Sequence, residues 1–137
     1  AEGELQLWKI AIKPGKPLAS GRVGEADFIG LPGNPVSGYV TFAVLVRDFL
    51  RARMGEVVPA WQPLYHLPAA FDWRKPDTRR EEYLRVRVAQ QGGQLVLQRY
   101  PNQGSGVLTS CAWADALVRL QPGQQVQPGD MLPVYAL

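Results

Sequence analysis

Two lysines, Lys13 and Lys16, flank a Pro-Gly pair in the stretch Lys13-Pro14-Gly15-Lys16-Pro17. Proline followed by glycine suits the centre of a type II turn, which would bring the two lysines close together. Two ammonium groups held near each other repel, and an anion between them would relieve that repulsion. The turn is therefore a candidate anion site. The alternative is an exposed turn in which the lysines are only solvated.

A second candidate site is the stretch Gly30-Leu31-Pro32-Gly33-Asn34-Pro35-Val36-Ser37, where a predicted strand passes into a predicted helix. Asn34 is a good N-cap, and Pro35 suits the first helical position. We expect Gly33 to adopt backbone torsions that a side chain would forbid. Backbone amides and the Ser37 hydroxyl at a helix start can hold an anion. The alternative is a connection whose glycines and prolines only shape the turn.

The third candidate is the loop Asn102-Gln103-Gly104-Ser105-Gly106, in which a serine between two glycines could approach a ligand closely. A flexible loop is the alternative. Arg85 lies on the polar side of an alternating strand, where most arginines are solvated. His66 has no cysteine or acidic residue at metal-ligand spacing, so we interpret it as structural. The sequence contains no nucleophile motif, zinc site or nucleotide P-loop.

The first part of the chain must supply the elements that position the two earlier sites. Leu5 to Ile12 is predicted as one strand, and residues 18–26 as a polar connection. The stretch from Val36 to Met54 has helical periodicity and ends at Gly55, a typical helix stop. Frequent prolines follow, and we predict a domain boundary at about residues 55–60.

The second part of the chain reads as short strands joined by turns. Tyr83 to Val88 alternates strictly, Gln91-Gly92-Gly93-Gln94 is typical of a hairpin turn, and Leu95 to Arg99 alternates again. Further strands are predicted over 116–120 and 131–136, and a short helical turn within 107–114. Such a pattern predicts a small β-barrel or a compact sandwich.

Composition limits the classes of protein that this chain can represent. Its 137 residues are 46% hydrophobic, carry a net charge of +3 and include one cysteine, Cys111. We expect a soluble, cytoplasmic protein without a membrane partner, since no apolar run approaches the roughly 20 residues of a membrane helix. The charge is too small to favour nucleic acid as the main partner. The chain does not begin with Met, and we expect it to be part of a longer protein.

Taken together, the Lys13–Pro17, Gly30–Ser37 and Asn102–Ser105 motifs resemble the molybdopterin molybdenumtransferases, enzymes of molybdenum cofactor biosynthesis. The resemblance follows the order of the chain over essentially its whole length. It implies an α/β fragment followed by a small all-β barrel. Residues 1–56 would be the C-terminal part of a molybdopterin-binding α/β/α domain, and residues 57–137 would be the C-terminal β-barrel domain.

The resemblance also implies an activity: insertion of molybdenum from molybdate into adenylated molybdopterin, with release of AMP and with Mg²⁺ as cofactor. The Mg²⁺ ligands would lie outside this chain, which alone would be inactive, and the full-length enzyme would be a homodimer. The implied catalytic residues are Lys9, Lys13, Lys16 and Arg85. The implied molybdate- or substrate-binding residues are Lys13, Lys16, Pro17, Pro32, Gly33, Asn34, Ser37, Arg85 and Ser105.

Two other functions stay open at this point. One is a non-catalytic scaffold or binding module with the same fold, against which the presence of all the oxyanion-binding positions argues. The other is a nucleic-acid-binding barrel that uses the clustered arginines with Trp73 and Tyr83 as stacking platforms. Salt-dependent binding to an oligonucleotide would separate these two.

Overall fold

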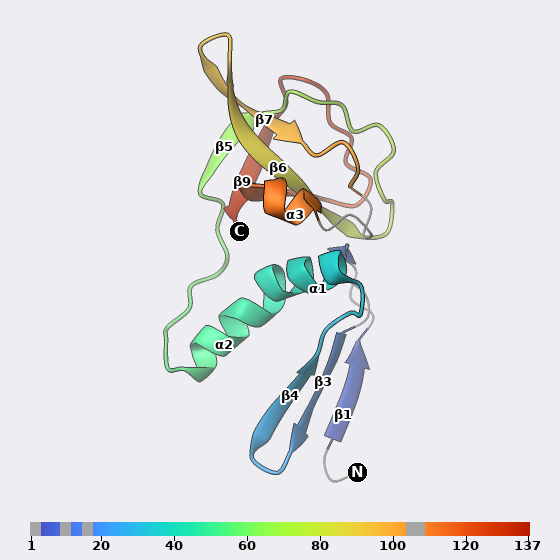
Figure 1. The fold of residues 1–137 in the computed structure, drawn as a ribbon, viewed down its shortest axis with the longest axis vertical. Coiled ribbons are helices and arrows are strands. Elements are labelled where there is room, and N and C mark those ends of the chain that lie inside the picture. The colour runs from blue at the N-terminus through green and yellow to red at the C-terminus, as the bar shows by residue number, and fades with distance from the viewer. Residues whose placement is uncertain (1–3, 9–11, 15–17, 104–108) are drawn as a thin grey trace.

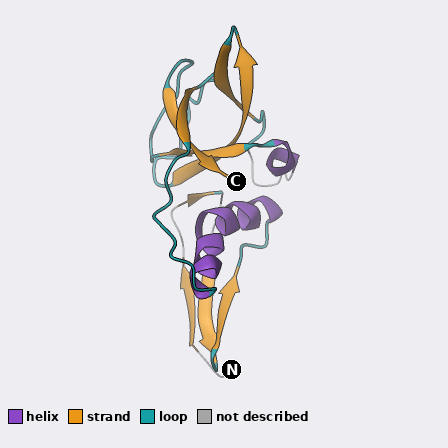
Figure 2. Ribbon diagram, turned by 90° about the vertical axis from the view of Figure 1, so that its left-hand side faces the viewer, coloured by secondary structure: helices purple, strands orange, loops and turns teal. Residues whose placement is uncertain are grey.

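The computed structural model describes residues 4–8, 12–14, 18–103 and 109–137 of the chain. Within them the fold is mostly β-sheet with few helices. A three-stranded sheet and a six-stranded sheet lie at opposite ends, and a long helical segment lies between them (Figure 1). The six-stranded sheet curls into a half-barrel (Figure 2).

The three-stranded sheet is antiparallel, in the order β1 (Glu4–Trp8), β3 (Leu18–Val23), β4 (Ala26–Gly30). The prediction of a polar connection over 18–26 is wrong, because β3 and β4 form a hairpin there. Gly24 makes its tight turn with a φ of 61°. The sequence Leu-Ala-Ser-Gly-Arg-Val has little apolar alternation, so β3 carries almost no strand signal.

The predicted helix over Val36 to Met54 is confirmed as an unbroken helical segment. It consists of α1 (Pro35–Thr41), a π-helical stretch η1 (Phe42–Val46) and α2 (Arg47–Arg53). Its termination near Gly55 is also confirmed, since that residue has a φ of 91°. The π-helical stretch in the middle was not predicted from the hydrophobic periodicity.

The six-stranded sheet contains the predicted strands of the second part of the chain. Its order is β2 (Ile12–Lys13), β6 (Glu81–Gln91), β8 (Ala116–Leu120), β9 (Met131–Ala136), β5 (Tyr65–Pro68), with β7 (Gln94–Arg99) paired to β6. The hairpin turn at Gly92 and Gly93 is confirmed, with φ values of 58° and 79°. The predicted helical turn is α3 (Thr109–Trp113). Strand β5 was missed because prolines surround and end it.

One prediction about the start of the chain is wrong. Leu5 to Ile12 does not form one strand, because β1 belongs to the three-stranded sheet and β2 to the six-stranded sheet. Residues 9–11 lie outside the described part of the chain. Strand β2 pairs in parallel with β6, with Ile12 opposite Glu81 and Lys13 opposite Glu82. Lys13 is therefore fixed to the sheet that carries Arg85.

Two clusters of buried side chains hold the described structure together. One fills the half-barrel with the inward residues of β6, β7, β8 and β9, among them Leu84, Val86 and Val118. The other joins the helical segment to the outer side of the half-barrel and consists of Val36, Val40, Ala43, Tyr83, Cys111 and Leu117. In the described residues we find no helix that is long and apolar enough to cross a membrane.

Candidate functional site

Arg85 is the most deeply buried charged residue of the predicted site, with 1% of its surface exposed. The strict alternation of β6 is confirmed, with Leu84 and Val86 facing the half-barrel interior. The alternative in which Arg85 is solvated is wrong, because the helical segment and α3 cover Tyr83 and Arg85, whereas Arg87 on the same face is exposed. A buried arginine must have its donors satisfied by fixed acceptors or by a ligand.

Among the described residues, three neutral acceptors hold the Arg85 guanidinium. Nε donates to Ser110 Oγ at 3.1 Å, Nη1 to the carbonyl of Tyr83 at 3.1 Å, and Nη2 to the carbonyl of Gln103 at 2.5 Å. Burial lowers the pKa of Arg85, while interaction with Cys111 acts weakly in the opposite direction. The guanidinium remains a cation at neutral pH, because arginine is not deprotonated in proteins. These acceptors therefore fix its position without neutralising its charge.

Lys13 and Arg85 line the same cavity, of about 270 Å³, at the junction of β2 and β6. Lys13 itself is exposed. The two cations come together because β2 is hydrogen-bonded to the strand that carries Arg85. The cavity is lined by Lys13, Pro14, Trp73, Glu82, Tyr83, Leu84, Arg85, Pro101, Asn102 and Gln103.

One carboxylate, Glu82, also lines this cavity. It is buried, and its Oε1 accepts hydrogen bonds from Trp73 Nε1 at 3.1 Å and from the backbone amide of Asp77 at 2.6 Å. These two donors orient the carboxylate and offset part of its charge. The named charged groups at the cavity are therefore two cations and one hydrogen-bonded carboxylate.

The loop before α1 has a different geometry from the one predicted. Asn34 is confirmed as the N-cap, and its Oδ1 accepts from the amides of Val36 at 3.0 Å and Ser37 at 3.3 Å. Two amides of the predicted anion seat are thus already occupied. The expectation for Gly33 is wrong, since it is not among the glycines with positive φ, and a Cβ there would meet no described atom within 4 Å.

The structure brings only some of the predicted residues together. Ser37 and Pro32 are buried next to the helix start, and neither is among the described residues that line the Lys13–Arg85 cavity. Lys9, Lys16, Pro17 and Ser105 lie outside the described residues. Gln103 belongs to the third candidate loop but had no predicted role of its own, and Glu82 was not predicted as a cavity residue. The sequence carries no distinctive signal for Glu82.

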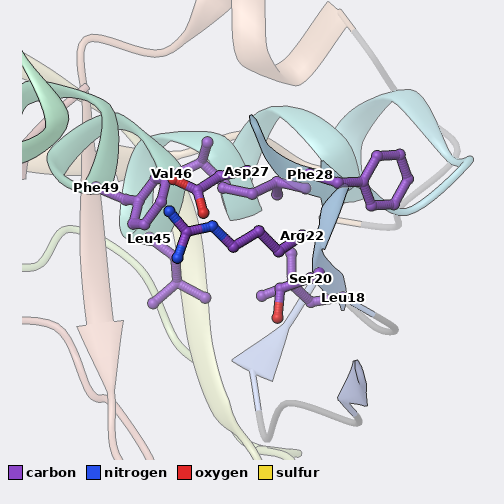
Figure 3. Close-up of a pocket in the computed structure, with 10 residues that line it drawn as sticks. Leu18, Ser20, Arg22, Asp27, Phe28, Leu45, Val46 and Phe49 are labelled. Carbon is purple, nitrogen blue, oxygen red and sulfur yellow. The ribbon is translucent and has the colours of Figure 1, made fainter. Parts of the chain in front are cut away.

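A larger cavity, of about 460 Å³, lies elsewhere, between the β3–β4 hairpin and the helical segment. Figure 3 shows Leu45 and Phe49 of the helical segment on one side of it, and Leu18 and Arg22 of β3 on the other. None of the described residues predicted for the site lines this cavity. Its lining is mainly apolar, so the smaller cavity with its two cations is the better candidate for an anion site.

Known proteins resemble this chain in both sequence and fold. A family model for the MoeA C-terminal region (domain IV) matches residues 66–137, the stretch from β5 to the last residue. The chain belongs to the MoeA family. The matched MoeA region includes Arg85 and the Asn102–Ser105 motif, whereas Lys13 and α1 precede it.

Curated relatives extend the likeness beyond the matched MoeA region. The chain is 34% identical over 119 residues to the molybdopterin molybdenumtransferase of Haemophilus influenzae, and this alignment covers 87% of this chain and 30% of that protein. It is 30% identical over 134 residues to the molybdenum cofactor synthesis protein cinnamon of Drosophila melanogaster, and that alignment covers 94% of this chain and 22% of the relative. The chain therefore spans less than a third of the length of these relatives.

Solved structures show the same arrangement of elements. A molybdopterin biosynthesis MoeA protein from Pyrococcus horikoshii superposes with a TM-score of 0.72 at 19% identity, covering 98% of this chain and 33% of that one. A second molybdopterin biosynthesis MoeA structure from Pyrococcus horikoshii gives a TM-score of 0.64 at 26% identity, covering 98% of this chain and 32% of that one. The first likeness shows a common MoeA fold that includes both sheets described here.

Proposed function

We propose that this chain carries the molybdate site of a molybdopterin molybdenumtransferase, an enzyme that transfers molybdenum to adenylated molybdopterin and releases AMP. Membership of the MoeA family and the names of its relatives support a role in molybdenum cofactor biosynthesis. The observation that carries the site assignment is the shared cavity of Lys13 and the buried Arg85. In this proposal the chain is the C-terminal part of the enzyme.

The chemistry of the cavity suits a tetrahedral dianion. Molybdate offers four oxygens that accept hydrogen bonds, and ammonium and guanidinium groups are strong donors to such oxygens. Each charged hydrogen bond contributes about 1.5–3 kcal/mol before desolvation is subtracted. Arg85 is already desolvated and held by acceptors on Tyr83, Gln103 and Ser110, so little further ordering of its side chain is needed on binding.

The remaining predicted residues belong to the same proposal. Lys16, Pro17, Ser37 and Ser105 would complete the oxyanion shell, and Lys9 would lie near the molybdopterin. Residues 1–56 would be the end of an α/β/α molybdopterin-binding domain, with residues 57–137 as the barrel domain, in a dimeric enzyme. The described residues contain no group of three or more His, Cys, Asp or Glu side chains that could hold Mg²⁺, so we assign no step to a metal in this chain.

Isothermal titration of the chain with sodium molybdate tests the site. Lys13→Gln and Arg85→Lys should each weaken binding about tenfold or more, equivalent to about 1.4 kcal/mol. Lys75→Gln is the matched control, because Lys75 is exposed and lies outside the cavity lining. Circular dichroism confirms that each variant is folded. Equal affinity of all three variants for molybdate would rule out this cavity.

A second test uses the full-length enzyme. There, Arg85→Ala should still bind adenylated molybdopterin but lose molybdate-dependent release of AMP. Unchanged molybdate dependence would remove Arg85 from the site. A full-length enzyme that releases no AMP even with Arg85 in place would favour the scaffold alternative.

A further inference from the structure

The side-chain amide of Gln103 forms two hydrogen bonds with the main chain of Arg85. Arg85 N donates to Gln103 Oε1 at 2.9 Å, and Gln103 Nε2 donates to the carbonyl of Arg85 at 2.9 Å. The register of β6 with β7 ends at the pair Val86–Arg99, and beyond it one backbone bond continues, from Tyr100 N to the carbonyl of Arg85 at 3.2 Å. The Gln103 amide therefore accepts from the Arg85 amide, which β7 leaves unpaired, and adds a second donor to the Arg85 carbonyl.

The same residue also holds the other end of Arg85. The main-chain carbonyl of Gln103 accepts from Arg85 Nη2, and its Nε2 donates a further bond to the carbonyl of Tyr100 at 2.9 Å. Backbone and guanidinium of Arg85 are thus both bonded to one residue. Gln103 in turn is anchored to the turn that follows β7. Gln103 also lines the cavity that Lys13 and Arg85 share. A change at Gln103 that displaced Arg85 would therefore alter the candidate anion site.

We infer that Gln103 is a positioning residue for Arg85, an inference that rests on the proposed molybdate site. The side-chain amide of Gln103 holds the main chain of β6 in place at Arg85, and its main-chain carbonyl fixes the plane of the guanidinium. A planar donor group recognises an oxyanion only in a narrow range of orientations. Loss of the Gln103 hydrogen bonds should therefore weaken molybdate binding without removing the charge of Arg85. Gln103 acts through Arg85 and is not proposed to touch the anion.

The test replaces Gln103 with Met, which has a similar length but neither amide donor nor amide acceptor. Gln98→Met is the matched control, because Gln98 is an exposed glutamine on β7 opposite Arg87. Molybdate affinity is measured by titration at a temperature at which both variants are fully folded. The Arg85 Nε–H signal is followed by NMR, since its exchange with water reports how firmly the guanidinium is held.

We expect Gln103→Met to weaken molybdate binding about tenfold and to speed exchange of the Arg85 Nε–H, whereas Gln98→Met changes neither. With Arg85→Lys in the background, Gln103→Met should have little further effect on affinity, because both act on the same contact. Unchanged exchange in Gln103→Met would overturn the positioning role. So would equal affinities of the two methionine variants in a protein that binds molybdate.

Failure of the proposed function would give a different result in these experiments. If the unaltered chain does not bind molybdate, the proposed site is wrong for this chain. The exchange of the Arg85 Nε–H in Gln103→Met then still decides whether Gln103 holds the guanidinium.

Discussion

Trp61 lies against Tyr135 of β9, with ring centroids 4.4 Å apart and planes inclined by 36°. The same indole stacks on Tyr83 of β6 at 6.1 Å. Trp61 belongs to the irregular segment 54–64 between α2 and β5, and it packs against the cluster that joins the helical segment to the half-barrel. The connecting segment is therefore fastened at its middle to the sheet that follows it.

Replacing Trp61 with Ala should destabilise the contact between the helical segment and the half-barrel. Fully buried tryptophans cost roughly 3–5 kcal/mol on truncation to Ala, and the half-buried Trp61 should cost about 2 kcal/mol. Urea unfolding measures the loss. Trp61→Phe, which retains an aromatic ring, should recover at least half of it. A loss below about 0.5 kcal/mol in the Ala variant would show that the stacking contributes little.

Asn34 should stabilise the start of α1 by capping it. Asn34→Ala removes the acceptor for two backbone amides and should cost about 1 kcal/mol in thermal unfolding. Asn34→Asp keeps an acceptor at the same place and should be close to unaltered protein in stability. If both variants lost the same stability, the side-chain bonds to Val36 and Ser37 would not be the cause.

The carboxyl of Asp77 should titrate well below an ordinary aspartate. Its pKa falls to about 2 because it accepts from the amides of Arg79 and Arg80 and, in addition, from the Arg80 side chain. Since the folded-state pKa lies below the unfolded value near 3.8, the stability that it contributes is complete above about pH 4. That contribution is lost as the pH falls towards 2.

Carbon-detected NMR of the side-chain carboxyls measures this titration, and Asp77→Asn identifies the signal. A midpoint near 4 would show that the turn over residues 77–80 does not hold its hydrogen bonds in solution. The Asp77→Asn variant should also show a smaller decrease in stability between pH 4 and pH 2 than the unaltered protein.

Limited proteolysis tests the predicted domain division at residues 56–57. Thermolysin should cut first within residues 55–60, where Val57 is 97% exposed and no regular structure intervenes. The two pieces should separate on a denaturing gel but co-elute in gel filtration, because β2 pairs with β6 and α1 packs on Tyr83. A first cut inside Val36–Arg53 would contradict the helix, and separate elution would contradict the packing.

Much of the fold was predictable because its signals are local. The cap at Asn34, the stop at Gly55, the Gly92–Gly93 hairpin and the alternation of β6 each depend on a few neighbouring residues. The pairing of β2 with β6 was not predictable, since it joins residues about 70 positions apart. Strand β3 was not predicted because its sequence has little apolar alternation, and the π-helical stretch was not predicted because the hydrophobic pattern of the helix continues through it.

The candidate site was predictable only as a set of residue types. Lys13 and Arg85 are far apart in the sequence, and only the family resemblance predicted that they belong to one site. The sequence could not show that Arg85 is buried, because a polar residue on an alternating strand is ordinarily solvated. That burial depends on α1 and α3 covering the second face of β6. The role of Gln103 was not predictable, because it depends on the Arg85 amide pairing with a side chain 18 residues further along the chain.

The two-residue strand β2 has a mechanical consequence. Lys13 comes from the part of the chain that precedes the helical segment, yet its backbone is bonded into the sheet that holds Arg85. The backbone spacing between the two cations is therefore set within one sheet. It does not depend on how the three-stranded sheet is oriented relative to the half-barrel.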